Sequence, residues 1–146
     1  MALNLEDQLG YNLNRTAMLF RRELIRALRP YEGMTPEQWQ TLNVLWQSET
    51  ALSPSEIREI TLQDLPSISR MIKRMEDNGW IKRGADATDK RSFRVELTPS
   101  GRKLEKEVPP ALLGHFQEIL GTLSEAETRA LLKSLKKLRK QMEDSD

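Results

Sequence analysis

The spacing of apolar residues over the first thirty positions predicts a long helix. Between Leu5 and Leu28 an apolar side chain recurs every three or four residues, which is the period of an α-helix. Tyr11, Met18 and Ile25 form a second apolar stripe on another face of the same helix. A helix with two apolar faces is expected to pack against its own domain and also against a partner chain.

Local start signals predict the other helices. Three of these signals pair a hydroxyl N-cap with a proline in the first helical turn, at Thr35-Pro36, Ser53-Pro54 and Thr98-Pro99. Asp64 is the expected N-cap of a helix that runs to Asn78 and stops at the glycine that follows. The prolines after Val108 kink or restart the next helix, and a capping box at 124–127 opens a last helix with a leucine stripe from 131 to 142.

The apolar period changes from helical to alternating after the glycine at position 79. Ser92–Leu97 alternates polar and apolar positions, as a half-buried strand does. Residues 80–83 are its expected partner across the polar loop 84–91. Residues 35–98 therefore predict a helix, a short helix, a longer helix and a hairpin, which is a helix-turn-helix followed by a wing.

The expected fold class is mainly α with a small two- to three-stranded β-wing. We expect residues 1–146 to form a single domain in which residues 35–98 are the DNA-binding unit. The helices over 1–30 and 105–146 are expected to flank this unit and to form a homodimer.

The residue types present exclude several classes of function. The chain has no cysteine and one histidine, which excludes a disulfide framework, a cysteine zinc site, a thiol nucleophile and a multi-histidine metal site. It has no glycine-rich phosphate loop, and Glu56 and Glu59, which could be drawn as acid and base, lie on a solvated helix face. We therefore expect no enzyme, cofactor or metal. No apolar run reaches the ~20 residues of a membrane span, and the chain does not start with a signal peptide, so we expect a soluble, cytoplasmic protein with no membrane partner.

The net charge of +1 hides a basic block in the middle of the chain. Residues 66–104 hold 10 Lys/Arg against 5 Asp/Glu, whereas residues 1–64 and 105–146 carry net charges of −3 and −1. A local basic block suits a polyanion such as double-stranded DNA, although a solvated charged surface would give the same count. The alternative to a DNA-binding regulator is a helical protein-interaction module in which the wing is incidental.

The helix over 64–78 has the side chains that a groove-reading helix needs. At ~100° per residue its buried stripe is centred on Ile68, and the opposite face presents Arg70 and Lys73. Ser69 and Arg74 lie on the shoulders of that face. Hydroxyls and guanidinium groups bond to base edges in the major groove, where arginine binds guanine through two hydrogen bonds.

Several motifs make the chain resemble the MarR family of winged-helix transcriptional regulators. Residues 65–83 are similar to the family's recognition helix and first wing strand. Asp89-Lys-Arg91, the later Leu97-Thr98 and Gly101 look like its wing signature, and Gln38-Trp39 also fits. The resemblance covers the whole chain. It implies a homodimeric, sequence-specific regulator of the repressor type that binds a pseudo-palindromic double-stranded DNA operator.

The resemblance also implies roles for individual residues. Arg91 is expected to enter the minor groove, Asp89 to orient that arginine, and Lys90 to contact phosphate. The expected major-groove set is Ser67, Ser69, Arg70, Lys73 and Arg74. Ser53 and Ser55, at a helix N-terminus, either contact a phosphate or only cap that helix.

A small ligand is the remaining implication of the resemblance. In the family an aromatic or phenolic anion often binds between the dimer helices and the winged helix and releases the DNA. The residues that could line such a pocket are Tyr11, Arg15, Trp39, Trp46, His115 and Phe116. Aromatic residues at helical spacing are more often part of a core than of a ligand pocket, and both interpretations stay open.

Overall fold

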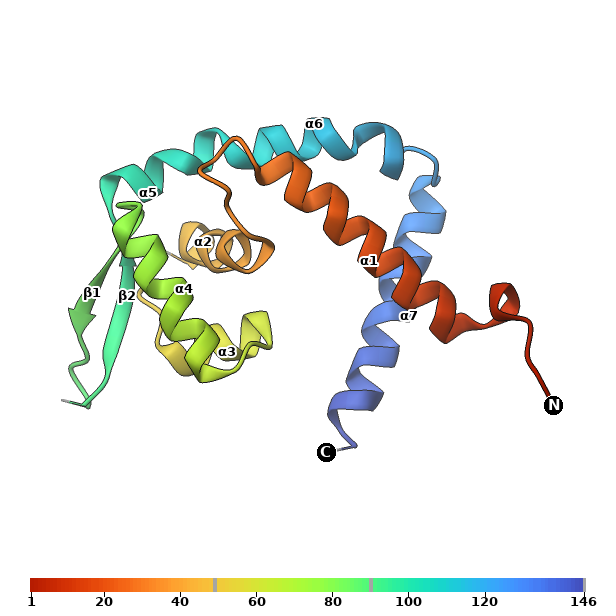
Figure 1. Cartoon of the computed structure of the whole chain (residues 1–146), viewed down its shortest axis with the longest axis horizontal. Coiled ribbons are helices and arrows are strands. Elements are labelled where there is room, and N and C mark those ends of the chain that lie inside the picture. The colour runs from red at the N-terminus through yellow and green to blue at the C-terminus, as the bar shows by residue number, and fades with distance from the viewer. Residues whose placement is uncertain (49, 90, 146) are drawn as a thin grey trace. The chain divides into compact units, whose positions relative to one another are not determined.

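The computed structural model describes residues 1–48, 50–89 and 91–145 and divides into two compact units, Met1–Leu112 and Leu113–Asp146. The first unit contains, in chain order, the 3-10 helix η1 (Leu5–Asp7), α1 (Leu9–Leu28), α2 (Pro36–Ser48), α3 (Pro54–Thr61), α4 (Leu65–Asp77), β1 (Ile81–Ala85), β2 (Phe93–Leu97), α5 (Pro99–Lys103) and the 3-10 helix η2 (Leu104–Lys106) (Figure 1). Helix α6 (Val108–Leu120) begins in the first unit, and α7 (Glu125–Glu143) belongs to the second. The expectation of a mainly helical fold with a small β-wing is confirmed.

The predicted first helix is interrupted at Gln8, so the expectation of one helix from Leu5 is wrong. Gln8 has an extended backbone and separates η1 from α1. Asn4 caps η1 by accepting a hydrogen bond from the backbone N–H of Glu6 (3.3 Å). The side-chain amide of Asn12 donates to the carbonyl oxygens of Glu6 (2.9 Å) and Gln8 (2.8 Å). These polar contacts fix the break, and apolar periodicity alone does not reveal them.

Helices α2, α3 and α4 form around a core that their apolar stripes share. Ser53 and Asp64 cap α3 and α4 as expected, and Gly79 ends the α4 segment with a φ of 77°. The core residues that are at most 1% exposed include Leu42, Ile57, Ile68, Ile72 and Val95. The buried stripe of α4 fixes which of its faces is left to solvent.

The wing is the antiparallel hairpin of β1 and β2. Its register pairs Ile81 with Leu97 and Ala85 with Phe93, so β1 extends two residues into the predicted loop 84–91, whereas β2 begins one residue after the predicted start at Ser92. Leu52 adds an isolated bridge to Val95, with N–H to O distances of 3.0 and 2.7 Å. The hairpin therefore has two strands plus a one-residue third strand.

Trp80, expected in the first wing strand, belongs to the turn before it. Its side chain is 5% exposed, and its backbone N–H donates to the carbonyl of Met75 (3.0 Å). Its carbonyl accepts the N–H of Thr98 (3.1 Å). This exchange joins the end of α4 to the end of the wing.

The C-terminal capping box is confirmed. In it, Ser124 accepts the backbone N–H of Glu127 (3.1 Å), and the Glu127 carboxylate accepts the N–H of Ser124 (3.0 Å). These hydrogen bonds from Ser124 hold the pKa of Glu127 below its usual value. The box fixes the start of α7.

Candidate nucleic-acid interface

Helix α4 presents a hydroxyl and basic face to solvent. Its N-cap, Asp64, accepts the backbone N–H of Ser67 at 2.7 Å, and this bond holds the pKa of Asp64 below its usual range. Because Ile68 and its neighbours on the buried stripe face the core, Ser69, Arg70 and Lys73 are exposed. The geometry matches the predicted recognition face, and the predicted set also includes exposed Arg74 and half-buried Ser67.

The cations on this face differ in their partners. The guanidinium of Arg70 donates to the Ser67 hydroxyl at 3.2 Å, a contact that orients it and leaves its charge intact. The ammonium of Lys73 forms an ion pair with Asp77 at 3.1 Å, one helical turn further on. Part of the Lys73 charge is therefore compensated, although both side chains are exposed and the pair is weak.

The wing tip is built from short carboxylate turns. Asp86 accepts the backbone N–H (2.9 Å) and hydroxyl (2.8 Å) of Thr88, and these hydrogen bonds lower the pKa of Asp86. Asp89 accepts the backbone N–H of Arg91 at 2.9 Å. Asp89 was predicted to orient Arg91, and its carboxylate holds the backbone of that exposed residue. Lys90 lies outside the described residues.

Arg83 links the wing to the recognition helix, a role that sequence reasoning missed. Its Nε donates to the Glu76 carboxylate at 2.6 Å, and its guanidinium lies 4.5 Å from the ring centroid of Phe93. One side chain of β1 thus contacts both the last turn of α4 and the first residue of β2. The hairpin register brings these groups together, and no local motif marks them.

Arg94 makes the corresponding link to α3. Its guanidinium donates to the carbonyl of Ala51 (3.0 Å) and to the Glu56 carboxylate (3.1 Å). Glu56 also closes a capping box with Ser53, so this carboxylate has a structural role. Of the two interpretations of Ser53 the structure shows capping, while Ser55 is exposed in the first turn of α3.

The residues predicted for a ligand pocket come from helices α1, α2 and α6. Trp46 is 4% exposed and its indole N–H donates to the carbonyl of Gly101 (2.9 Å), so it packs in the core of the first unit. On α1, Arg15 donates to the hydroxyl of Tyr11 (2.7 Å), and this contact raises the pKa of Arg15. Trp39 is half-buried in α2. His115 and Phe116 make an edge-to-face contact, with ring centroids 5.2 Å apart, in the second unit.

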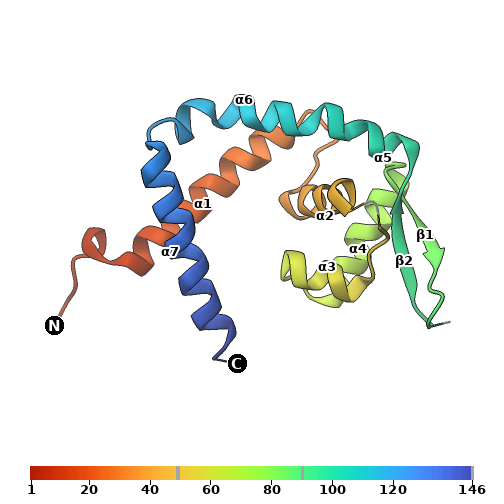
Figure 2. The same ribbon diagram turned by 180° about the vertical axis from the view of Figure 1, so that it is seen from behind.

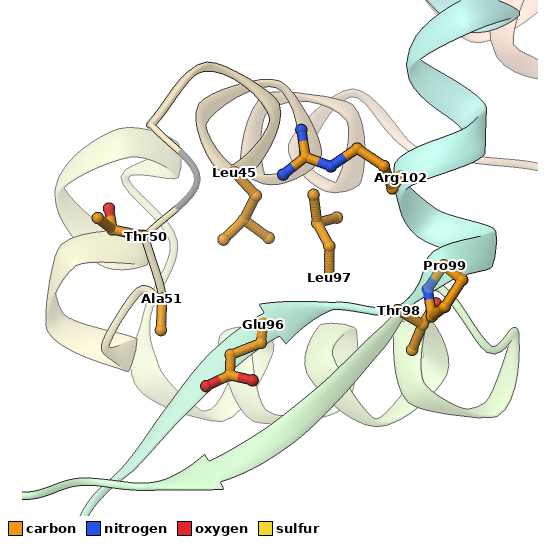
Figure 3. Close-up of a pocket in the computed structure, with 8 residues that line it drawn as sticks. All are labelled: Leu45, Thr50, Ala51, Glu96, Leu97, Thr98, Pro99 and Arg102. Carbon is orange, nitrogen blue, oxygen red and sulfur yellow. The ribbon is translucent and has the colours of Figure 1, made fainter.

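Two of the hollows in the first unit adjoin the wing and the predicted recognition face. One, of about 350 Å³, lies behind the wing; Leu45 and Leu97 face it, and Arg102 and Glu96 lie at its sides (Figure 3). The other, of about 270 Å³, adjoins α4 and is lined by Arg21, Thr35, Glu37, Gln38, Gln63, Ser67, Arg70, Met71 and Arg74. The buried side-chain oxygen of Gln63 has no hydrogen-bond partner among the described residues. The second hollow therefore contains the guanidinium groups of Arg21, Arg70 and Arg74, and the last two belong, with Ser67, to the predicted recognition face.

Within the described residues, no group of three or more His, Asp or Glu side chains could hold a metal ion. No helix in the described part of the chain is long and apolar enough to cross a membrane.

Comparisons with known proteins agree with this geometry. The sequence profile described as MarR family matches residues 32–92. The chain is 28% identical over 138 residues to a putative transcriptional regulatory protein for the hcr operon of Thauera aromatica, covering 94% of this chain and 82% of that protein.

Two solved structures share the fold. One is a cysteine-to-serine mutant of MarR from E. coli complexed with operator DNA, at 26% identity and a TM-score of 0.79, covering 89% of this chain and 92% of that one. The other is Bordetella bronchiseptica BpsR, whose DNA binding is regulated by 6-hydroxynicotinic acid, at 24% identity and a TM-score of 0.81, covering 95% and 98%. With the helix-turn-helix and wing described above, these matches show that the chain is similar to the MarR family of winged helix-turn-helix transcriptional regulators, which are DNA-binding proteins and not enzymes.

Proposed function

We propose that the protein is a homodimeric repressor that binds a pseudo-palindromic operator and is released from it by a small aromatic anion. The observation that carries this proposal is the common placement of the two basic elements. The tip of the wing and the N-terminal end of α4 lie on the same side of the first unit in both views (Figures 1 and 2). One duplex surface could thus receive α4 in its major groove and Arg91 in its minor groove.

Exposed apolar side chains on the terminal helices support the dimer. In α1, Leu9 and Met18 are 64% and 66% exposed, and in α7, Leu132 and Met142 are 51% and 64% exposed. Apolar surface of this kind on a single chain is typical of an interface. Light scattering at micromolar concentration should give a dimer, and a particle of one chain mass, 16.9 kDa, would contradict it. A symmetric dimer would present two α4 helices to half-sites about one helical turn of DNA apart or a multiple of it.

Arg70 and Lys73 are proposed to divide base reading from phosphate contact. Arg70 keeps its full charge and is one turn into α4, whereas Lys73 is a point charge without the planar fork that recognises guanine. Arg70→Ala should lower affinity for the operator and flatten discrimination at one base pair per half-site. Lys73→Ala should weaken all sequences about equally and reduce the salt slope by about 1 per lost phosphate contact, or about 2 per dimer.

The experiment measures binding to a selected operator, a base-substituted operator and random duplex at several salt concentrations. Arg91→Ala should cost about 1–3 kcal/mol per site, the value of one good groove contact. Arg26→Ala, an exposed arginine of α1, is the matched control. If Arg26→Ala and Arg91→Ala lost equal amounts of operator affinity, the proposed contact between the wing and DNA would be wrong.

The hollow beside α4 is the site that we propose for the releasing ligand. An aromatic anion there would be held by Arg21, Arg70 and Arg74 and could donate to the unsatisfied oxygen of Gln63. Because Arg70 and Arg74 also belong to the recognition face, anion and DNA would compete for them.

Arg21 can be used to distinguish anion binding from DNA binding. It lines the hollow, but it lies on α1 outside the recognition face and pairs with Glu37 at 2.8 Å. Salicylate and 6-hydroxynicotinate should displace operator DNA from the wild-type protein. Arg21→Ala should keep the DNA affinity and lose the displacement. Displacement that Arg21→Ala leaves unchanged would place the ligand elsewhere, and a reporter gene under the selected operator would show whether binding represses or activates.

A further inference from the structure

Two leucines at the start of the recognition helix are exposed although nothing in the fold requires it. Between residues 26 and 112 the large hydrophobic side chains classed as exposed, among the residues described, are Leu62 at 87% and Leu65 at 49%. Leu62 lies in the turn that joins α3 to α4, and Leu65 is the first residue of α4. The other apolar residues of the helix-turn-helix face its core, so this pair is a local departure from the pattern.

The backbone at Leu62 makes the departure more pronounced. Leu62 is the C-cap of α3 and has a left-handed conformation with a φ of 60°, and its N–H donates to the carbonyl of Arg58 at 2.8 Å. Glycine or asparagine is usual in that conformation, and a leucine there costs free energy. Neither core packing nor helix termination benefits from this side chain. Strained, exposed residues of this kind point to a function.

The position of the pair suggests what it contacts. The turn between α3 and α4 lies on the same side of the unit as the N-terminal end of α4 and the tip of the wing (Figures 1 and 2). The N-terminal residues of a recognition helix contact base edges in the major groove. Thymine is the base that presents an apolar group there, its C5-methyl, and apolar side chains pack against that methyl.

We propose that Leu62 and Leu65 contact thymine C5-methyl groups in the operator and thereby select thymine at those positions. The inference rests on the operator binding proposed above. It assigns to apolar contacts a part of the sequence reading that Arg70 and the serines of α4 do not supply. Burial of apolar leucine surface against the DNA would also explain why both leucines are exposed in the free protein.

The test removes single methyl groups from the DNA. An operator is first selected from random duplexes, and each thymine in turn is then replaced by deoxyuridine, which lacks only the C5-methyl. Wild-type protein should lose about fourfold in affinity for each contacted methyl, the factor that corresponds to one buried carbon. The loss should be confined to a few thymines at equivalent places in the two half-sites.

Three protein variants are measured against the same thymine and deoxyuridine operators. Leu62→Gly removes the side chain and keeps the left-handed backbone, and Leu65→Ala truncates the helical partner. Each should bind the thymine operator about fourfold to tenfold more weakly than wild type, and each should be insensitive to deoxyuridine at its own contact. Glu32→Gly is the matched control, because Glu32 is the other non-glycine residue with positive φ among those described (φ 53°). It should retain the full wild-type response to deoxyuridine.

The outcomes separate this inference from the function on which it rests. Specific binding that no deoxyuridine changes, or that deoxyuridine changes equally in wild type and variants, overturns the methyl contact and leaves the regulator intact. If Leu65→Ala removes the sensitivity to deoxyuridine and Leu62→Gly does not, the role of Leu62 is overturned. Failure to select any operator overturns both proposals. The inference is supported if both leucine variants lose the sensitivity to deoxyuridine and Glu32→Gly keeps it.

Discussion

The substitution Gly101→Ala tests a close backbone approach between α5 and the turn before β1. A Cβ atom at Gly101 would lie 2.0 Å from the carbonyl oxygen of Trp80 and 2.9 Å from its carbonyl carbon. Favourable non-bonded contacts are about 3.5–4.0 Å, so α5 and the turn before β1 would have to separate by more than about 1 Å. The Trp80 carbonyl accepts the N–H of Thr98, and Trp46 donates to the carbonyl of Gly101 itself. Any such movement therefore strains two hydrogen bonds, of which the one from Trp46 is buried.

The magnitude follows from these contacts. Overpacking of a well-packed region costs about 1–3 kcal/mol, and loss of one hydrogen bond costs about 0.5–1.5 kcal/mol. Alanine recovers up to about 1 kcal/mol through its higher helix propensity. We expect Gly101→Ala to lower the free energy of unfolding by about 2–3 kcal/mol, a large part of the 5–15 kcal/mol or so that a domain has.

Urea unfolding followed by tryptophan fluorescence, at one protein concentration, measures this difference. Gly114→Ala is the control, because Gly114 lies within α6 and a Cβ there would meet nothing within 4 Å. It should raise the free energy of unfolding by up to about 1 kcal/mol. A Gly101→Ala protein within about 0.5 kcal/mol of wild type would refute the steric reasoning, as would a shift of the same sign in both variants.

Three further predictions concern charged residues of the interface. Asp77→Asn removes the partner of Lys73, so binding to random duplex at low salt, measured by fluorescence anisotropy, should tighten about twofold to fivefold; unchanged or weaker binding would contradict it. Asp89→Ala removes the acceptor for the Arg91 backbone, so operator binding should weaken even though a negative charge is lost, and tighter binding would remove that role. The pKa of Asp64 is lower in the folded state than its ordinary 3.8, so the stability it adds is complete above that value and is lost as the pH falls through the folded-state pKa. Asp64→Asn should flatten this acid limb in melting temperatures recorded from about pH 5 to pH 2, and identical acid limbs would exclude the contribution.

The element order was predictable because its signals are local. The N-caps at Ser53, Asp64 and Ser124 all form the hydrogen bonds that their residue types suggest. The buried stripe around Ile68 likewise fixes the solvent face of α4, since a helix has one geometry at ~100° per residue. Most of the candidate interface followed from those two facts and from the charge of the block that contains α4.

Contacts between distant residues were not predictable in the same way. The pairing of Arg83 with Glu76 and Phe93 depends on the hairpin register, and that of Arg94 with Ala51 depends on how the wing packs on α3. Periodicity places such residues on a face and does not choose their partners. The break at Gln8 was missed for a related reason, because side-chain amides compete there with the helical hydrogen bonds.

These missed contacts have a consequence for how the interface reads DNA. Arg83 joins β1 to the last turn of α4, while Arg94 and the bridge between Leu52 and Val95 join β2 to the region before α3. The wing is thereby held to both helices of the helix-turn-helix at positions away from its tip. If α4 and Arg91 make the two groove contacts proposed above, these links should restrict the angle between them before DNA binds and so lower the ordering cost of binding. Because Arg83 is remote from the wing tip, its loss should weaken the contact of Arg91 without touching Arg91, and the effect of removing both should be less than additive.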